Sequence, residues 1–219
     1  EIDHCLVGSE MCIRASIGIG GMGAADLASI SSHKAVDVVA LCDVDSKALT
    51  QASKIHPEAK TYKDYRLMFK DMSLDFDAVI VSTPDHTHAP ASIMAMEMNK
   101  PVYCQKPLTH FVSEARDMRK LAEQKNLVTQ MGIQVHSFYD YKLATVLIQS
   151  GIIGKVHTVR AWTDRNFGYD GPVPEGKDPI PDSLDWNLWL GTSPERPYKE
   201  KYYHPGSWRK LVDYGCGTL

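Results

Sequence analysis

A run of glycines near the start of the chain most strongly limits how this sequence can fold. Residues 17–24 read Ile-Gly-Ile-Gly-Gly-Met-Gly-Ala and fit the pattern G-x-G-x-x-G, with Gly18, Gly20 and Gly23 in register. In such a turn the glycines allow a tight passage from strand to helix, a close approach of backbone amides to an anion, and close helix–strand packing. The free amides at the helix start favour a phosphate. Taken alone, the run fits an ordinary glycine-rich loop equally well.

An acidic residue at the end of a predicted strand supports a phosphate-binding turn over an ordinary loop. Asp43 closes the apolar segment 36–42, twenty residues after Gly23. A carboxylate at this place can accept hydrogen bonds from ribose hydroxyls and would repel a 2′-phosphate. The glycines, the helix, the strand and Asp43 together predict a site for NAD, with NADP the less favoured cofactor.

Alternating strand and helix patterns predict the fold class. We expect strands at 36–42, 77–82, 101–104 and 127–131, and helices at 22–31, 45–55, 65–69, 89–98 and 113–124. This alternation is typical of an α/β protein with a doubly wound parallel sheet, the Rossmann arrangement, here assigned to residues 17–132.

The pattern changes after Gly132. A helix at 141–149 and an alternating strand at Lys155–Thr163 are followed by a long loop rich in Gly, Pro and Asp. Trp186 and Trp189 are three residues apart, a spacing that favours a short helix packed against the domain over stacking on a sugar ring. We assign residues 133–219 to a second part of the chain, which has too few strands to close a core of its own.

Residues 1–16 differ from the rest of the chain. A first Rossmann strand is buried on both faces and should be continuously apolar, but Arg14 and Ser16 interrupt it. The run Val7–Arg14 resembles a translated sequencing adaptor, and no signal peptide can be assembled from this segment. We expect residues 1–16 to be a non-native leader that has replaced the native start.

Composition narrows the class of protein. The 219 residues are 43% hydrophobic and 23% charged with a net charge of −3, values that favour an ordinary globular protein and disfavour a nucleic-acid surface. No apolar stretch reaches membrane-spanning length, and no His, Cys, Asp or Glu cluster has metal-ligand spacing. The default compartment is the cytoplasm, with an exported form left open.

Chemistry is expected where the strands end, because ligands of open parallel sheets bind outside the carboxyl ends of the strands. Five motifs fall there, and they predict this set of cofactor-binding residues: Gly18, Ile19, Gly20, Gly21, Met22, Gly23, Asp43, Thr83, Pro84, His88, Gln105, Lys106 and Gln134. His86, in the same stretch as His88, is expected to cap the following helix.

Lys106 is the sharpest catalytic candidate. A lysine at a strand end beside a nicotinamide can donate a hydrogen bond to a substrate oxygen and stabilise developing negative charge. The alternative is a solvated surface lysine, which its place between an apolar strand and a proline disfavours. His136 is either a proton carrier near the substrate or a hydrogen-bonded core histidine. Trp208 and Arg209 are expected, with Lys106 and His136, to contact the substrate.

These motifs, in this order, resemble the Gfo/Idh/MocA (glucose–fructose oxidoreductase/inositol dehydrogenase) family, in a subgroup common in Planctomycetes and Bacteroidetes. The matching stretches are 18–23, 42–45, 83–88, 104–108, 132–137 and 185–191. The resemblance implies NAD(P)-dependent oxidation or reduction of a sugar, cyclitol or related polyol. It also implies a Rossmann domain and a C-terminal α/β domain whose open sheet often forms homo-oligomers. On this resemblance, residues 133–219 are the start of that open-sheet domain, an incomplete substrate-binding and oligomerisation domain.

Two departures from the family pattern matter. The usual Glu-Lys-Pro is Gln105-Lys106-Pro107 here, so a charge beside Lys106 is lost. The family's later Asp and His acid–base pair would lie beyond Leu219, and the chain resembles a fragment of a longer protein. We expect the chain as written to bind NAD weakly, to catalyse no measurable hydride transfer and to aggregate. Two alternatives stay open, namely an NAD-dependent glycoside-cleaving enzyme and a non-catalytic nucleotide-binding protein.

Overall fold

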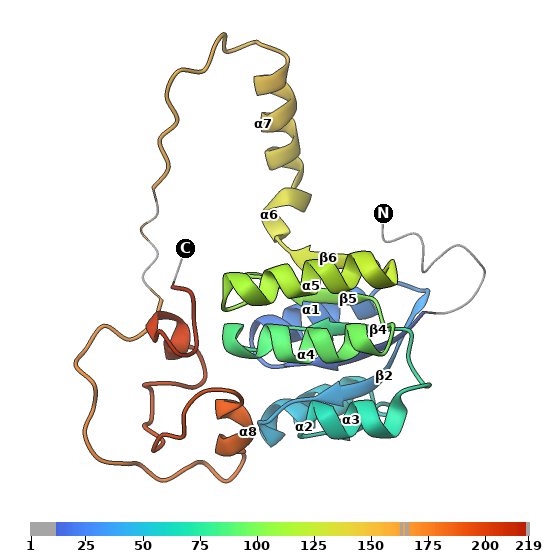
Figure 1. Ribbon diagram of the computed structural model, residues 1–219, viewed down its shortest axis with the longest axis vertical. Helices are drawn as coiled ribbons and strands as arrows, with labels where there is room; N and C mark the ends of the chain where they lie inside the picture. The colour runs from blue at the N-terminus through green and yellow to red at the C-terminus, as the bar shows by residue number, and fades with distance from the viewer. Residues whose placement is uncertain (1–11, 163, 165–166, 218–219) are drawn as a thin grey trace.

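A six-stranded parallel sheet forms the centre of the computed structural model, which describes residues 12–162, 164 and 167–217 (Figure 1). The strand order is β3-β2-β1-β4-β5-β6, the order of a dinucleotide-binding Rossmann sheet. The strands are β1 (Cys12–Ile17), β2 (Val36–Cys42), β3 (Lys60–Tyr62), β4 (Ala78–Val81), β5 (Val102–Gln105) and β6 (Thr129–Gly132). The predicted fold class is confirmed.

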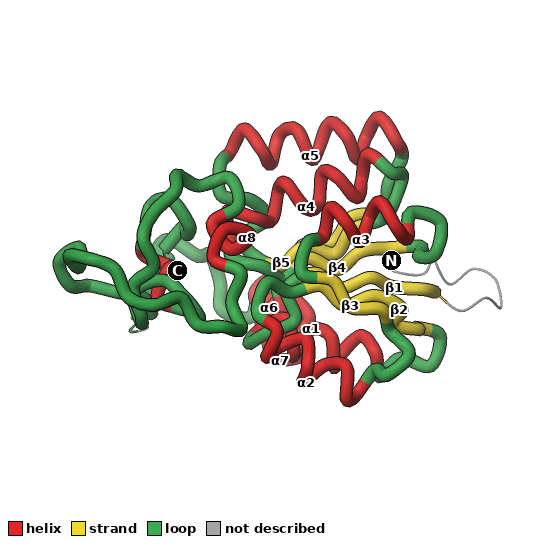
Figure 2. The backbone as a smooth tube through the Cα atoms, turned by 90° about the horizontal axis from the view of Figure 1, so that it is seen from below, coloured by secondary structure: helices red, strands yellow, loops and turns green. Residues whose placement is uncertain are grey.

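Helices cover both faces of the sheet (Figure 2). Helices α3 (Tyr65–Met72), α4 (Asp85–Glu97) and α5 (Val112–Lys125) lie on one face, and α1 (Met22–Ser31) and α2 (Ser46–Ile55) lie on the other. Each layer closes over its own cluster of buried apolar side chains. All four side chains of β4 are buried, because this strand is covered on both faces.

Strand β1 begins earlier than the sequence pattern indicated. It starts at Cys12 and pairs with β2 on one side and β4 on the other, at the centre of the sheet. Arg14 and Ser16, which were expected to interrupt the strand, are buried within it, with exposed fractions of 7% and 2%. Pairing along both edges of β1 outweighs the cost of these two polar side chains. Residues 12–16 of the expected leader therefore belong to the sheet, and residues 1–11 lie outside the described part.

Helix α4 also begins earlier than expected, at Asp85 instead of Ala89. Its N-cap position is Pro84, so His86 and His88 lie within the first turns of the helix. This shift brings both rings against neighbouring segments, where they make the contacts described below.

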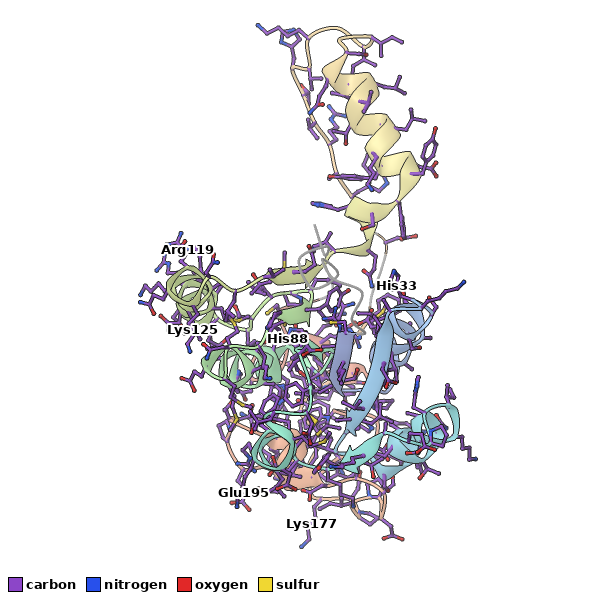
Figure 3. All side chains as sticks on the ribbon, turned by 90° about the vertical axis from the view of Figure 1, so that its right-hand side faces the viewer. His33, His88, Arg119, Lys125, Lys177 and Glu195 are labelled. Carbon is purple, nitrogen blue, oxygen red and sulfur yellow. The ribbon has the colours of Figure 1, made fainter. Side chains whose placement is uncertain are left out.

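Helices α6 (Gln134–Ser137) and α7 (Tyr139–Gln149) stand away from the sheet (Figures 1 and 3). The described part of the chain buries none of their side chains. The strand predicted at 155–163 is wrong for residues 155–162, which adopt no regular secondary structure; Thr163 lies outside the described residues. An alternating pattern indicates which side chains of a strand would face the core, but a strand forms only where its amides and carbonyls pair with a neighbouring strand. No described strand lies beside this segment.

The segment 167–217 returns to the carboxyl edge of the sheet and packs there through aromatic side chains. It contains α8 (Trp186–Leu190) and the short 3₁₀ helix η2 (Ser207–Lys210). Trp186 and Trp189 stack at 4.9 Å, and both are buried, so the predicted packing of a short helix against the domain is confirmed. The remaining buried members of this aromatic cluster are Leu184, Leu190, Tyr198, Tyr202, Tyr203, Trp208 and Tyr214.

Backbone hydrogen bonds hold this segment on the Rossmann body. The Asp185 amide donates to the Val44 carbonyl, the Ser46 amide donates to the Ser183 carbonyl, and the His86 amide donates to the Tyr214 carbonyl. Within the described residues, no helix is both long and apolar enough to span a membrane.

Candidate active site

A cavity of about 1580 Å³ opens at the carboxyl ends of the strands, between the Rossmann body and the returning segment. It brings together most of the residues expected from the sequence: Gly18, Gly20, Gly21, Met22, Asp43, Thr83, Pro84, Gln105, Lys106, Gln134, Trp208 and Arg209. Because parallel strands place their carboxyl ends at one edge, motifs far apart in the sequence meet here.

The glycine turn between β1 and α1 has the geometry that a phosphate site needs. Gly18 has φ +75°, and a Cβ at this position would lie 2.7 Å from the Thr83 amide nitrogen. A Cβ at Gly23 would collide with the Gly18 carbonyl oxygen, so this glycine lets α1 pack against the turn. Helix α1 begins after Gly21, and no described side chain caps it. Apart from the Gly23 amide, which donates to the Gly20 carbonyl at 2.9 Å, its first amides are available to a pyrophosphate, and the site fits a dinucleotide.

Asp43 ties the turn to the end of β2. Its Oδ2 accepts a hydrogen bond from the Ile19 amide at 2.8 Å, and its Oδ1 accepts one from the Asp45 amide at 2.9 Å. Burial raises the pKa of Asp43, and these two amide hydrogen bonds partly oppose the rise. The Ile19 amide is thus engaged by Asp43 and not by a phosphate. Each carboxylate oxygen keeps a further lone pair for a ribose hydroxyl.

Next to Asp43, the returning segment adds His204, which the sequence patterns did not identify. Its Nε2 lies 3.4 Å from Asp45 Oδ2, and its ring lines the cavity. Burial raises the pKa of Asp45, but hydrogen bonds from the Lys47 amide and from Ser183 and His204 outweigh burial, so this pKa is lowered on balance. Two acidic residues and a histidine, Asp43, Asp45 and His204, thus line the part of the cavity at the end of β2.

Lys106 lies where β5 ends, and its exposed side chain lines the cavity. No described group forms a hydrogen bond or ion pair with its ammonium, and a cis peptide bond joins it to Pro107. Its backbone amide donates to Gln105 Oε1 at 2.8 Å. A free ammonium inside the cavity can donate to a substrate oxygen.

The structure places His88 in the packed body and not at the cavity. It is 1% exposed and is not among the described residues that line the cavity. Its Nδ1 lies 2.6 Å from the Pro107 carbonyl oxygen, and its Nε2 lies 2.8 Å from the Thr83 carbonyl oxygen. The ring, labelled inside the packed body in Figure 3, joins the loops that follow β4 and β5, and its contact with a cofactor stays a prediction.

His86 lines the cavity but does not cap α4. Its Nε2 lies 3.0 Å from the Trp189 carbonyl oxygen, and its ring packs against Trp189 and Tyr214. Burial lowers the pKa of His86 to about 4, although its backbone hydrogen bonds act in the other direction. The neutral ring therefore links α4 to the returning segment.

Helix α6 carries two predicted site residues, Gln134 and His136, and only one of them lines the cavity. Gln134 lines the cavity, and its Nε2 donates to the Met22 sulfur at 3.4 Å. His136 is exposed, stacks on Tyr141 at 5.1 Å, and is not among the described lining residues. The structure thus brings Gln134, but not His136, to the site.

Trp208 and Arg209 reach the cavity from η2. Trp208 is 6% exposed and donates from Nε1 to the Pro205 carbonyl, while the Arg209 guanidinium lies 4.6 Å from the Trp208 ring centroid. Arg209 also donates to the Gly206 carbonyl. This pairing holds the guanidinium at the cavity wall.

Several lining residues have no counterpart among the predictions. They include Arg66, Trp162, Phe167, Asn187, Trp189, Thr192 and Cys216. Only Asn187 and Trp189 lie in a motif that the sequence analysis had identified, since the return of a long loop to the sheet edge leaves no local pattern. Over the part of the chain that the structure describes, no group of three or more His, Cys, Asp or Glu side chains could hold a metal ion.

Comparisons with known proteins identify the family of the chain. The family described as "Oxidoreductase family, NAD-binding Rossmann fold" matches residues 14–133, and "Oxidoreductase family, C-terminal alpha/beta domain" matches residues 131–219. Inositol 2-dehydrogenase of Salmonella typhimurium is 33% identical over 174 residues, which are 77% of this chain and 50% of the relative. The chain thus spans about half the length of the curated relatives that it matches.

Solved structures show the same fold. The crystal structure of myo-inositol 2-dehydrogenase from Lactobacillus plantarum has a TM-score of 0.63 and 28% identity, covering 67% of this chain and 43% of that one. The WlbA dehydrogenase from Chromobacterium violaceum, solved with NADH and UDP-GlcNAcA, has a TM-score of 0.61 at 22% identity, covers 68% of this chain and 42% of that one, and shares the fold. The glycine turn, the strand order and the family match over residues 14–133 lead to one conclusion: the chain belongs to the Gfo/Idh/MocA family of oxidoreductases and carries its NAD-binding Rossmann domain.

Proposed function

We propose that this protein is an NAD-dependent dehydrogenase that oxidises a hydroxyl group of a sugar, cyclitol or related polyol. The observation that carries the proposal is the free Lys106 ammonium in the same cavity as the glycine turn. The inositol 2-dehydrogenases among the relatives support a polyol as the substrate class.

In this proposal the cofactor site is built from β1, α1 and β2. The amides at the start of α1 hold the pyrophosphate, and Gly18 and Gly23 let the backbone come close enough. The free lone pairs of Asp43 accept hydrogen bonds from the adenosine ribose. The same carboxylate repels a 2′-phosphate, so NAD binds better than NADP.

At the reacting end, NAD when bound accepts a hydride from the carbon that bears the hydroxyl group. Lys106 donates a hydrogen bond to the hydroxyl oxygen and stabilises the negative charge that grows as the proton leaves. Arg209 donates to neighbouring hydroxyls, and Trp208 offers an apolar ring face. We keep His136 as the predicted acceptor of this proton; its ring stacks on Tyr141 at 5.1 Å, and it is not among the described residues that line the cavity.

Replacing Lys106 tests the proposal. Lys106→Met should lower turnover by a factor on the order of a hundred or more and leave NAD affinity nearly unchanged, because the ammonium acts on developing charge. Lys120→Met is the matched control, since this lysine is exposed and its nearest acidic partner is Asp117 on the same helix, at 3.5 Å. Turnover of a polyol panel is followed by NADH absorbance, and NAD and NADP binding by calorimetry, both with the protein expressed from its gene.

The outcomes separate the functions. One NADH per substrate molecule supports the dehydrogenase, whereas product without NADH release indicates cleavage through transient oxidation. Normal turnover of Lys106→Met would show that Lys106 is an ordinary surface lysine with no part in the reaction. Tighter binding of NADP than of NAD would contradict the role of Asp43.

A further inference from the structure

We infer that Asp26 on α1 is a positioning residue for Lys106 and acts through the side-chain amide of Gln105. The Gln105 Nε2 donates to both carboxylate oxygens of Asp26, at 3.1 and 3.3 Å. The Gln105 Oε1 accepts the hydrogen bond from the Lys106 amide at 2.8 Å. A single amide group therefore joins the carboxylate on α1 to the backbone of Lys106. The inference rests on the proposed function to the extent that Lys106 is the reacting lysine.

A third strand end joins the same network. The Ser82 hydroxyl, directly after β4, donates to Asp26 Oδ2 at 2.7 Å. Asp26 lies one helical turn after Gly23, the glycine that packs α1 against the turn. The carboxylate is thus fixed relative to the proposed pyrophosphate site, and it holds the ends of β4 and β5 at once. The network couples the position of Lys106 to the position of the cofactor-binding helix.

The Gln105 amide has little freedom to leave this arrangement. Its residue is 4% exposed, and a Cβ on Gly132 of β6 would lie 3.2 Å from Gln105 Cδ and 2.5 Å from the Tyr103 hydroxyl. The space beside the amide is therefore filled on the β6 side and closed by Asp26 on the α1 side. Burial, and then the Asp26 charge, raise the pKa of Tyr103, which agrees with a carboxylate close to β5.

The polarity of the network explains why position 105 carries an amide. A carboxylate at 26 needs a donor opposite it, and the Lys106 amide needs an acceptor. The Gln105 side chain supplies both from one planar group. A glutamate at 105 would place a second carboxylate against Asp26, and like charges at this distance repel. Gln105, which replaces the glutamate of Glu-Lys-Pro, is thus complementary to the Asp26 carboxylate on α1.

A set of four variants tests this inference. Asp26→Ala removes the anchor of the amide, and Gln105→Glu introduces the repelling charge. The double variant Asp26→Asn with Gln105→Glu reverses the polarity, since the new amide donates to the new carboxylate and still accepts from Ser82. Asp37→Asn is the control, because Asp37 is exposed on β2 and its substitution removes the same charge.

Hydrogen exchange of the Lys106 amide, followed by NMR, measures the network without reference to activity. Asp26→Ala should speed this exchange roughly tenfold, since the acceptor on Gln105 is no longer held. Asp26→Ala and Gln105→Glu should each lower kcat roughly tenfold with NAD affinity within a factor of about three, and the double variant should regain most of the loss. Asp37→Asn should match the unmodified protein in both measurements.

Two results would overturn the inference. One is an unchanged Lys106 exchange rate in Asp26→Ala. The other is a double variant that is no better than Gln105→Glu, because a merely structural carboxylate is not rescued by reversed polarity. If the protein expressed from its gene, without substitutions, makes no NADH from any polyol, the proposed function fails instead, and the exchange rates still decide the role of Asp26.

Discussion

Gly23 and Gly20 stand three residues apart in one turn and tolerate a side chain to very different extents. A Cβ at Gly23 would strike the Gly18 carbonyl oxygen, whereas at Gly20 the nearest atoms, Ala48 Cβ and Asp43 Oδ2, lie 3.7 and 3.8 Å away. The first glycine is required for packing. The second, which lines the cavity, has room at ordinary contact distance.

Gly23→Ala should therefore lower the free energy of unfolding by about 1–3 kcal/mol, because the new methyl group forces α1 away from the turn. Gly20→Ala should change it by less than about 1 kcal/mol. Urea unfolding followed by circular dichroism measures both. Equal destabilisation of the two variants would show that the turn is not packed in this way.

The G-x-G-x-x-G pattern was sufficient to locate the turn and to predict a phosphate site, because the backbone demands of such a turn are local. It could not tell which of Gly20 and Gly23 has room for a side chain, since that depends on where the fold places the Gly18 carbonyl oxygen, Ala48 and Asp43. The Asp26–Gln105 contact was missed for a similar reason. The i, i+3 spacing from Gly23 to Asp26 was visible, but the partner 79 residues away was not.

Helix α4 shows how an element can join two parts of the chain. Its first turns carry His86, whose ring is 3% exposed against Trp189 and Tyr214 of the returning segment. Burial keeps the ring neutral by lowering its pKa to about 4 from the usual 6.5. The unfolded chain binds a proton as the pH falls below 6.5, and the folded chain does not until about pH 4, so this residue removes stability across that window.

The unmodified protein should accordingly lose stability between pH 7 and pH 5, with an upper bound of about 3 kcal/mol from this group by pH 4. His86→Gln keeps a donor for the Trp189 carbonyl but does not titrate, so its stability should depend less on pH over the same range. Thermal unfolding at several pH values measures both proteins. Parallel pH curves for the two would contradict the neutral, buried state of His86.

At the level of elements, periodicity predicted most helices and strands to within a few residues, because both faces of the sheet are packed against helices. It was wrong in two places. It missed the start of β1, and it predicted a strand at residues 155–162 where none forms. Arg14 and Ser16 are held in a strand by pairing on both edges. The alternating segment 155–162 has no described partner strand, so its pattern did not produce one.

The molecule as a whole is uneven in its packing. The Rossmann body buries continuous cores on both faces, whereas α6, α7 and residues 151–162 project from it (Figure 1). Large apolar side chains of these projecting segments are exposed. Val146 and Leu143 of α7 are 60% and 41% exposed, and Trp162 is 88% exposed. Apolar surface of this kind favours association between chains.

We expect the 219-residue chain to self-associate at tens of micromolar concentration, and Leu143→Lys with Val146→Lys to weaken that association. Leu74→Lys is the control, since Leu74 is 92% exposed on a loop of the Rossmann body, away from α7. Sedimentation velocity over a range of concentrations measures the three proteins. A monomeric unmodified chain, or an equal effect of Leu74→Lys, would contradict a role for α7.

The cavity takes its walls from both ends of the described chain, from Ile17 at the end of β1 to Gly217 near the C-terminus. A molecule lodged there touches the Rossmann body and the returning segment together, and only their docked arrangement offers the complete set of contacts. By thermodynamic linkage, each such contact adds its free energy to the docking of residues 167–217. Binding in the cavity therefore stabilises the docked arrangement of residues 167–217, and docking of this segment strengthens binding to the same extent.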